Sequence, residues 1–157
     1  MPKIIPCLWY DDQAEEAVNF YVSIFRNSKI GKAARYGDAG PGPKGQVVSV
    51  EFELDGQPYT AINGGPMFQF TEAVSFQVNC ETQAEVDYYW DALLAGGGKP
   101  SQCAWLKDRY GLSWQVVPTI LGRLMSDPDA AKANRVVQAM LKMTKIEIAG
   151  LEAAAAG

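Results

Sequence analysis

The sequence predicts an α+β fold built from two βαβββ modules and a C-terminal group of helices. Three observations support this prediction. Residues 1–70 follow a strand–helix–strand–strand–strand order, and residues 71–118 begin the same order again. A polar capping signal precedes a helix in each half, at Asp12 and at Thr82. Residues 119–157 lose the strand pattern and carry apolar side chains at helical spacing, so we expect a helical extension there.

The first module opens with a short apolar stretch, residues 4–9, that is typical of a strand. Asp12 is followed three positions later by Glu15, an acidic variant of the capping box, which predicts that a helix begins at Asp12. A second strand is predicted over residues 28–36. The apolar residues that recur at helical spacing between them are Ala14, Ala17, Val18, Tyr21, Ile24 and Phe25.

Two further strands complete the first module. The segment 38–45 contains Gly-Pro-Gly-Pro, which predicts a hairpin loop. Residues 47–54 alternate as VVSVEFEL, the pattern of a half-buried strand. Asp55-Gly56 is a strong turn signal, and it separates this strand from another over residues 57–63.

The second module begins with residues 73–79, AVSFQVN, whose alternation predicts a strand. Thr82 and Glu85 form a capping box ahead of a helical stretch, and the glycines at 96–98 predict that this helix ends in a left-handed cap. Two strands are then predicted, and a turn stabilised by Asp108-Arg109 lies between them. These strands are residues 101–106 and 113–117.

The extension is predicted to contain a short helix over residues 119–125, a longer helix opened by Asp127-Pro128-Asp129, and a last segment over residues 146–156. A surplus of apolar surface predicts an interface, so we expect a homodimer. The alternative is that the extension covers the chain's own sheet. The residues that form this surplus are Leu121, Leu124, Met125, Val136, Val137, Met140 and Leu141.

The composition is that of an ordinary globular protein. The 157 residues include 48% hydrophobic and 20% charged residues, with a net charge of −4, which is enough apolar material for a core. No basic stripe is present, so nucleic acid is not an expected partner. No apolar run reaches the roughly 18 residues of a membrane span, so we expect no membrane partner. Three widely spaced cysteines and the lack of a signal-type apolar start predict a reducing compartment, the cytoplasm.

Histidine is absent from the sequence. It is the commonest general base near neutral pH and the commonest transition-metal ligand. Its absence excludes His-based catalytic triads, His-bearing zinc sites and facial-triad iron sites. Cys7 is the remaining candidate nucleophile, but only Lys3 is near it in sequence to lower its pKa, so we expect an inert thiol.

Several segments resemble the PhnB-like proteins of the vicinal-oxygen-chelate superfamily, which includes glyoxalases, bleomycin-resistance proteins and extradiol dioxygenases. The resemblance rests on IIPCLWYDD and QAEEAVNFYVSIF near the start, on CAWLKDRYGLSWQVVP, and on DPDAAKANRVVQAMLKMTKIEIAGLEAA in the extension. It implies that the two modules form a cupped mixed sheet around a cavity. Members often carry the label 3-demethylubiquinone-9 3-methyltransferase, which implies an enzyme acting on a quinone-like or other aromatic compound.

The resemblance also implies where metal ligands would lie, on the first and last strand of each module. These positions fall at Cys7 or Pro6, near Asn63, at Ala73 and at Gln115. Only a cysteine among them could supply an anionic ligand, so we expect no bound metal.

We also expect no cofactor. S-adenosylmethionine usually needs a glycine-rich turn between a strand and a helix, where the backbone can approach it closely. None of the glycine clusters, at 40–45, 64–65 and 96–98, has this context.

The cavity is therefore expected to hold a small hydrophobic or aromatic molecule by amide hydrogen bonds and stacking. Strand alternation places polar side chains on the cavity side of the second module. Three alternatives stay open: a solvated sheet face with core aromatic residues, an enzyme on an aromatic substrate, and a dimeric scaffold with a vestigial cavity. The candidate binding residues are Cys7, Trp9, Asn63, Ser75, Gln77, Trp105 and Gln115.

Overall fold

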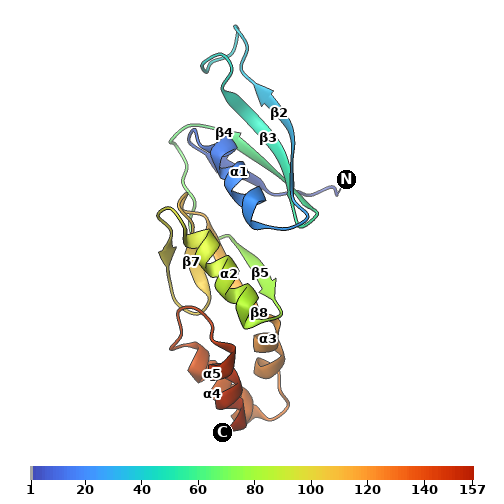
Figure 1. The fold of residues 1–157 in the computed structure, drawn as a ribbon. Coiled ribbons are helices and arrows are strands. Elements are labelled where there is room, and N and C mark those ends of the chain that lie inside the picture. Colours follow the sequence, from blue (N-terminus) through green and yellow to red (C-terminus); the bar gives the residue numbers. More distant parts are fainter. Residues whose placement is uncertain (1) are drawn as a thin grey trace. The chain divides into compact units, whose positions relative to one another are not determined.

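The computed structural model describes residues 2–157, which divide into two compact units (Figure 1). The first unit ends at Phe70, and the second comprises Thr71–Gly157. Each unit contains one four-stranded mixed sheet with a helix on it, and the second also contains the C-terminal helices. The predicted α+β class and the predicted helical extension are confirmed.

The sheet of the first unit has the strand order β1-β4-β3-β2. Strands β1 and β4 run parallel, and the other two pairs are antiparallel. The predicted strands 47–54 and 57–63 are confirmed at both ends. The elements of this unit are β1 (Cys7–Tyr10), α1 (Ala14–Ile24), β2 (Lys29–Arg35), β3 (Val47–Leu54) and β4 (Gln57–Asn63).

Helix α1 lies across one face of this sheet (Figure 1). The apolar residues predicted at helical spacing form its buried side, with the exception of Phe25, which follows the helix and is only half-buried. On the sheet, Leu8, Tyr10, Val50 and Phe52 are buried. The hydroxyl groups of Tyr10 and Tyr21 are 3.0 Å apart and hydrogen-bonded, so a polar contact joins strand and helix within the core.

The predicted start of α1 at Asp12 is wrong. The residue at the N-cap is Gln13, and its side chain accepts no hydrogen bond from the helix. The backbone N–H of Ala14 instead donates to Oδ1 of Asn63, at 2.8 Å. Asn63 also donates from Nδ2 to the Val47 carbonyl oxygen, at 3.0 Å, so one amide from β4 caps the helix and ties it to β3.

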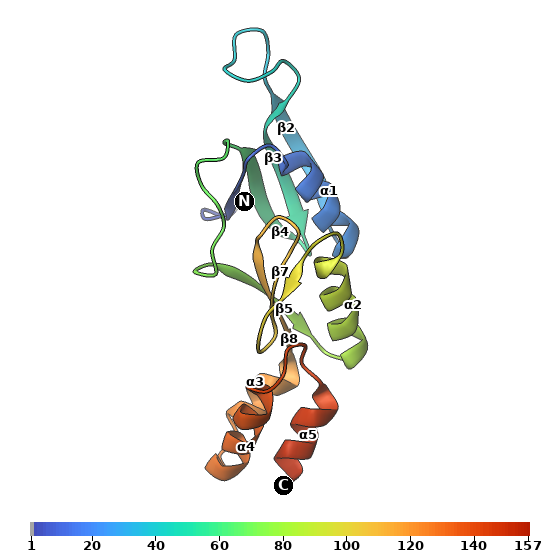
Figure 2. The same cartoon turned by 90° about the vertical axis from the view of Figure 1, so that its left-hand side faces the viewer.

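The sheet of the second unit has the order β5-β8-β7-β6, with β5 and β8 parallel and the other pairs antiparallel. This repeats the topology of the first sheet strand for strand, which confirms the predicted duplication of the βαβββ order. Helix α2 covers one face of this sheet (Figure 2). The elements are β5 (Ser75–Cys80), α2 (Gln83–Leu94), β6 (Lys99–Pro100), β7 (Trp105–Lys107) and β8 (Ser113–Pro118).

Both ends of α2 follow the prediction. The Thr82 hydroxyl accepts a hydrogen bond from the Glu85 backbone N–H, at 3.2 Å. After the helix, Gly96 takes a left-handed conformation with φ +82°, which glycine adopts without strain. Gly98 is needed for a different reason: a Cβ there would lie 2.8 Å from the Lys107 carbonyl oxygen, so its lack of a side chain lets the loop approach β7.

The predicted strand 101–106 is only partly present. The chain turns between β6 and β7, and Cys103 and Ala104 take left-handed conformations with φ +55° and +80°. Their backbone N–H groups donate to the carbonyl oxygens of Met143 and Thr144, at 2.8 and 2.9 Å. The extension thus supplies hydrogen bonds that an extended strand would have taken from a neighbouring strand.

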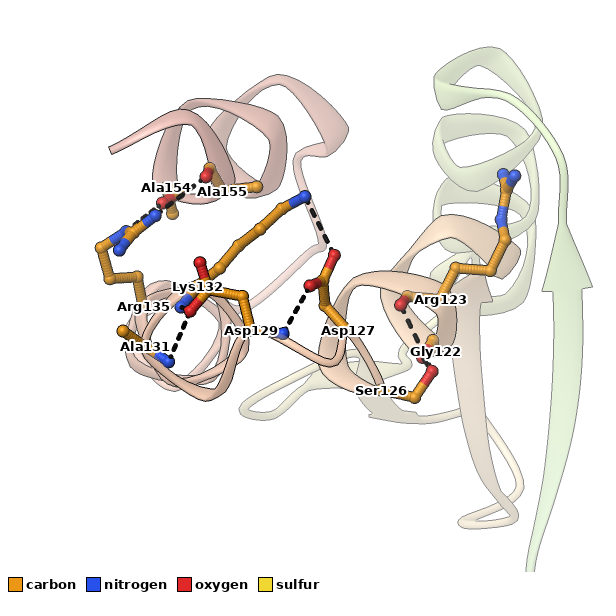
Figure 3. Close-up of polar contacts among 10 residues, drawn as sticks. All are labelled: Gly122, Arg123, Ser126, Asp127, Asp129, Ala131, Lys132, Arg135, Ala154 and Ala155. Atoms are coloured by element: carbon orange, nitrogen blue, oxygen red, sulfur yellow. Dashed lines mark hydrogen bonds and ion pairs between the residues drawn. The ribbon is translucent and has the colours of Figure 1, made fainter.

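The extension consists of α3 (Thr119–Met125), α4 (Ala130–Met140) and α5 (Ile148–Ala156). As predicted, Asp129 opens the long helix: its carboxylate accepts from the backbone N–H groups of Ala131 and Lys132 (Figure 3). Arg135 links α4 to the end of α5 by donating to the carbonyl oxygens of Ala154 and Ala155, at 2.9 and 3.0 Å (Figure 3). Cations and donors suit the C-terminal end of a helix.

The extension has its own apolar core, and this core meets the second sheet through the buried Ala104, which precedes β7, and through Val117 of β8. The Gln83 side chain joins it to α2, donating to the Ile146 carbonyl oxygen and accepting from the Ile148 N–H. Much of the apolar surplus is therefore covered within the chain, including Leu121 and Val136. The expected homodimer stays a prediction. The other buried members of this core are Ile146 and Leu151. Two apolar side chains of the extension remain exposed, Met125 at 39% and Leu141 at 59%.

Among residues 2–157, no helix has both the length and the apolar character that a membrane crossing requires.

The turn between β7 and β8 is organised by Asp108, as predicted. This carboxylate is buried, with 3% of its surface exposed. Its Oδ1 accepts from the backbone N–H groups of Tyr110 and Leu112, and its Oδ2 accepts from the Trp114 indole N–H at 2.9 Å. One side chain therefore satisfies three donors and sets the start of β8.

We predict that Asn63→Ala lowers the free energy of unfolding by about 1–3 kcal/mol, because the variant leaves an N-terminal helix N–H and the Val47 carbonyl without their partner. Urea denaturation followed by circular dichroism measures the change. The matched control is Asn79→Ala on an exposed strand position, which should stay within about 0.5 kcal/mol of the parent. Equal stability of the two variants would contradict the capping role.

We also predict that Asp108→Ala destabilises the chain by about 2–4 kcal/mol, since three donors in the buried turn lose their acceptor. Asp12→Ala serves as the control, because Asp12 is exposed and does not cap α1. The same urea experiment compares them. The Trp114 indole N–H should also exchange faster with solvent in Asp108→Ala, and unchanged exchange would argue against this assignment.

Candidate functional site

The open face of the second sheet, on the side away from α2, carries most of the predicted binding residues. Alternation in β8 is as expected: Trp114 and Val116 are buried on the α2 side, and Gln115 lies on the opposite side. In β5, Ser75 and Gln77 share the open face, since they pair with Ser113 and Gln115. In β7, Trp105 pairs with Gln115 and so also lies on this face.

Four predicted site residues are thus brought together: Ser75, Gln77, Trp105 and Gln115. Gln115 donates from Nε2 to the Ser75 hydroxyl oxygen, at 3.0 Å. Gln77 donates from Nε2 to Oδ1 of the neighbouring Asn79, at 2.8 Å. Trp105 is half-buried, so part of its indole is accessible beside the two amides. The row Gln77–Gln115–Trp105 offers amide donors and acceptors next to an aromatic surface.

The sequence-based prediction missed an ion pair at this face, between Lys107 and Glu72. Lys107 pairs with Ser113 across β7 and β8, and it forms an ion pair with Glu72, which precedes β5. The interaction with Lys107 lowers the pKa of the Glu72 carboxyl below its usual value. Alternation from Trp105 could have placed Lys107 on the open face, but its partners depend on strand pairing, which the sequence does not display.

Ser113 is the most deeply buried polar residue of the open face, with 1% of its surface exposed. Within residues 2–157 its hydroxyl oxygen has no hydrogen-bond partner. Buried hydroxyls are normally paired, because an unpaired one loses its interaction with water and gains nothing in return. Ser113 therefore lacks, among residues 2–157, the hydrogen-bond partner that a buried hydroxyl normally has, although its strand position places it on the open-face side.

Cys7 and Trp9 lie in the first unit, on the face of its sheet away from α1, where they pair with Thr60 and Ile62. The Trp9 ring is held by the segment after β4. Its indole N–H donates to the Gly65 carbonyl oxygen, at 2.9 Å, and its ring contacts Phe68 edge-on at 4.9 Å between centroids. A Cβ at Gly64 would lie 2.3 Å from this ring, so only glycine allows the approach.

Asn63 does not belong to an open face. It pairs with Tyr10, whose side chain points toward α1, and both of its amide ends are used in capping that helix. The open-face position of β4 is taken by Ile62, one residue earlier. We expected the Asn63 side chain to line the cavity, and this is wrong by one position. A shift of one residue along a strand moves a side chain to the other face of the sheet.

The residues at the metal positions implied by the superfamily do not fit a divalent cation. Burial raises the pKa of the Cys7 thiol, so it is protonated at neutral pH. The Asn63 amide is used in capping α1, and Ala73 has no ligand atom and precedes β5. Gln115 is neutral and hydrogen-bonded to Ser75. In the part of the chain that the structure describes, no three His, Cys, Asp or Glu side chains come together to hold a metal.

The other cysteines offer no clear nucleophile either. Cys80 is buried at the end of β5, and burial, with smaller contributions from Glu85 and Glu81, raises its pKa to about 12. A thiol of this kind is almost wholly protonated at neutral pH and reacts slowly. Cys103 is half-buried in the turn that the extension holds.

Residues 2–117 match the sequence model of the 3-demethylubiquinone-9 3-methyltransferase family. No curated protein matches the chain. Among solved structures, a PhnB protein from Bacillus cereus is 37% identical, with a TM-score of 0.69, and the match covers 75% of this chain and 100% of that one.

More distant structures support the fold alone. Protein PA1353 from Pseudomonas aeruginosa is 21% identical with a TM-score of 0.61, and the match covers 75% of this chain and 98% of that one. FosX, a fosfomycin resistance protein from Listeria monocytogenes, was solved with manganese and sulfate. It is 17% identical, with a TM-score of 0.54, over 79% of this chain and 97% of that one. On the family match and the likeness to the Bacillus cereus PhnB protein, this chain belongs to the 3-demethylubiquinone-9 3-methyltransferase family.

Proposed function

We propose that this chain binds a small hydrophobic or aromatic molecule on the open face of its second sheet, without a metal. The observation that carries the proposal is the row Gln77–Gln115–Trp105, which sets two amides beside a half-buried indole. Indoles bind planar apolar groups, and neighbouring amides orient them through hydrogen bonds. The buried Ser113 hydroxyl, which has no hydrogen-bond partner among residues 2–157, lies at the next position on the same face.

An enzyme acting on a quinone-like or aromatic substrate is the alternative that the family's name suggests. Two observations speak against methyl transfer from S-adenosylmethionine. The glycines that follow β4 use their backbone N–H groups internally: Gly64 donates to Tyr10 and Gly65 to Asp11. These donors are therefore not free to receive a cofactor, and the chain after them does not enter a helix. A scaffold with a vestigial site would not need an amide row or an unpaired buried hydroxyl.

We also propose that the chain works in the cytoplasm as a homodimer. Its expected partners are small molecules, and we expect it to bind neither nucleic acid nor membranes. The widely spaced cysteines, all three of them free thiols, suit a reducing compartment. The exposed Leu141 and Met125 on the extension are the apolar side chains that remain for a contact between copies. The net charge of −4 favours neither nucleic acid nor anionic lipid.

Titration with 3-phenylpropionamide, followed by ¹H–¹⁵N NMR, tests the proposed binding. We expect the Trp105 indole and the Gln77 and Gln115 side-chain amide signals to shift together. Gln115→Leu should weaken binding about 2- to 10-fold, since it removes hydrogen bonds but keeps the volume. Gln138→Leu on the exposed side of α4 is the control and should change nothing. Binding that leaves these three signals unmoved, or no binding at all, would contradict the proposal.

Elemental analysis of freshly purified protein tests the absence of a metal. We expect zinc, manganese, iron and nickel each well below one atom per chain, and a melting temperature that chelator does not change. The physical reason is that Cys7 is the single thiol among the implied positions, and the other implied positions offer no anionic ligand. About one metal atom per chain that disappears in Gln115→Ala would show that the prediction is wrong.

A further inference from the structure

A second cross-strand row lies beside the amide row on the same open face. Lys99 of β6 pairs with Lys107 of β7, Lys107 pairs with Ser113 of β8, and Ser113 pairs with Ser75 of β5. Residues that pair directly share a face of the sheet. The four side chains therefore form one continuous row, the Lys–Ser row, made of two ammonium groups and two hydroxyls.

This row is electrostatically unfavourable unless it meets an anion. Lys99 and Lys107 are direct cross-strand neighbours, and like charges at such positions repel each other. The chain as a whole carries a net charge of −4, so this pair of adjacent lysines is a local positive site on a chain that is negative overall. An anion between or beside the two ammonium groups would remove the repulsion.

The two serines supply hydrogen-bond donors at the other end of the row. The Ser75 hydroxyl oxygen accepts from Gln115, which leaves its own proton to donate. Ser113 is 1% exposed, and its hydroxyl has no partner among residues 2–157. A carboxylate can accept several hydrogen bonds at once, so it would accept from Ser75 while it neutralises Lys107, and from Ser113 once the side chains that cover this hydroxyl move aside.

One carboxylate already reaches this row from within the chain. Glu72, which lies in the segment before β5, pairs with Lys107. Its side chain is 61% exposed, and that of Lys107 is 41% exposed. Ion pairs this accessible to water contribute little stability, so an incoming carboxylate can displace Glu72 at small cost.

The two rows fit the two ends of one molecule. Trp105 and Lys107, like Gln115 and Ser113, are two residues apart on a strand, which corresponds to about 6.6–6.8 Å. We propose that the Lys–Ser row binds the carboxylate of an aromatic acid whose ring lies on Trp105, and that Glu72 occupies Lys107 in the free protein. The ligand class is thus an arylalkanoic acid, an aromatic ring joined by a short chain to a carboxylate. This inference rests on the proposed function and narrows it.

The test compares 3-phenylpropionate with its amide, 3-phenylpropionamide, by NMR titration at low and high salt. The two probes have nearly the same shape and differ in charge. We expect the acid to bind about 2- to 5-fold more tightly at low salt, with the preference reduced by salt. Glu72→Gln should raise the affinity for the acid by a similar factor, because it removes the competing carboxylate. Lys107→Met and Ser113→Ala should each reduce the preference for the acid.

Lys142→Met in the extension is the control for loss of one positive charge, and it should keep the preference of the parent. Glu72 is exposed, so Glu72→Gln tests the inference even if a variant at buried Ser113 folds poorly. Equal affinity for the acid and the amide, or no effect of Glu72→Gln, would overturn the Lys–Ser row as a carboxylate site and leave the proposed function intact. Failure of both probes to bind would contradict the proposed function, and this inference with it.

Discussion

Each sheet of this protein carries a helix, α1 or α2, on one face, and the alternation of side chains along the strands follows that arrangement. In the second unit, the side chains that face α2 are apolar and buried, as Trp114 and Val116 show. The alternate positions need not fill a core, so they can carry serine, glutamine and lysine. Because directly paired residues share a face, these polar side chains fall into rows across four strands. Within the second unit, the rows of polar side chains therefore lie on the face away from α2.

The extension contributes to the site although none of its residues belongs to it. It lies beyond residue 117, where the family match ends. Its carbonyl groups at Met143 and Thr144 hold the left-handed turn at Cys103 and Ala104, immediately ahead of Trp105. Backbone of this kind is costly and persists only where surrounding contacts stabilise it. The segment between α4 and α5 therefore helps to define where β7 begins, and with it where Trp105 and Lys107 lie.

The two modules share a topology but not a surface chemistry. On the first sheet, the face away from α1 carries Cys7 and Trp9 of β1, which pair with Thr60 and Ile62 of β4 at the positions that match the open-face positions of β5 and β8. Trp9 is fixed by Gly65 and Phe68, and Ile62 offers no polar group. Two amides on adjacent strands occur at these positions only in the second module. A duplicated fold can thus keep its backbone pairing while only one copy carries the groups that bind a ligand.

Local signals in the sequence determined the class of the fold, the alternation of β3, β4 and β8, and the caps at Thr82 and Asp129, because each depends on residues within a few positions of one another. The sequence also determined the family through its motifs and left no histidine for metal or base chemistry. Tertiary structure decided what depends on partners far along the chain. It placed Asn63 under α1, one residue away from the open face, and it joined Glu72, Lys99, Lys107 and Ser113 in one place. Strand pairing, which links residues up to dozens of positions apart, leaves no periodic trace in the sequence.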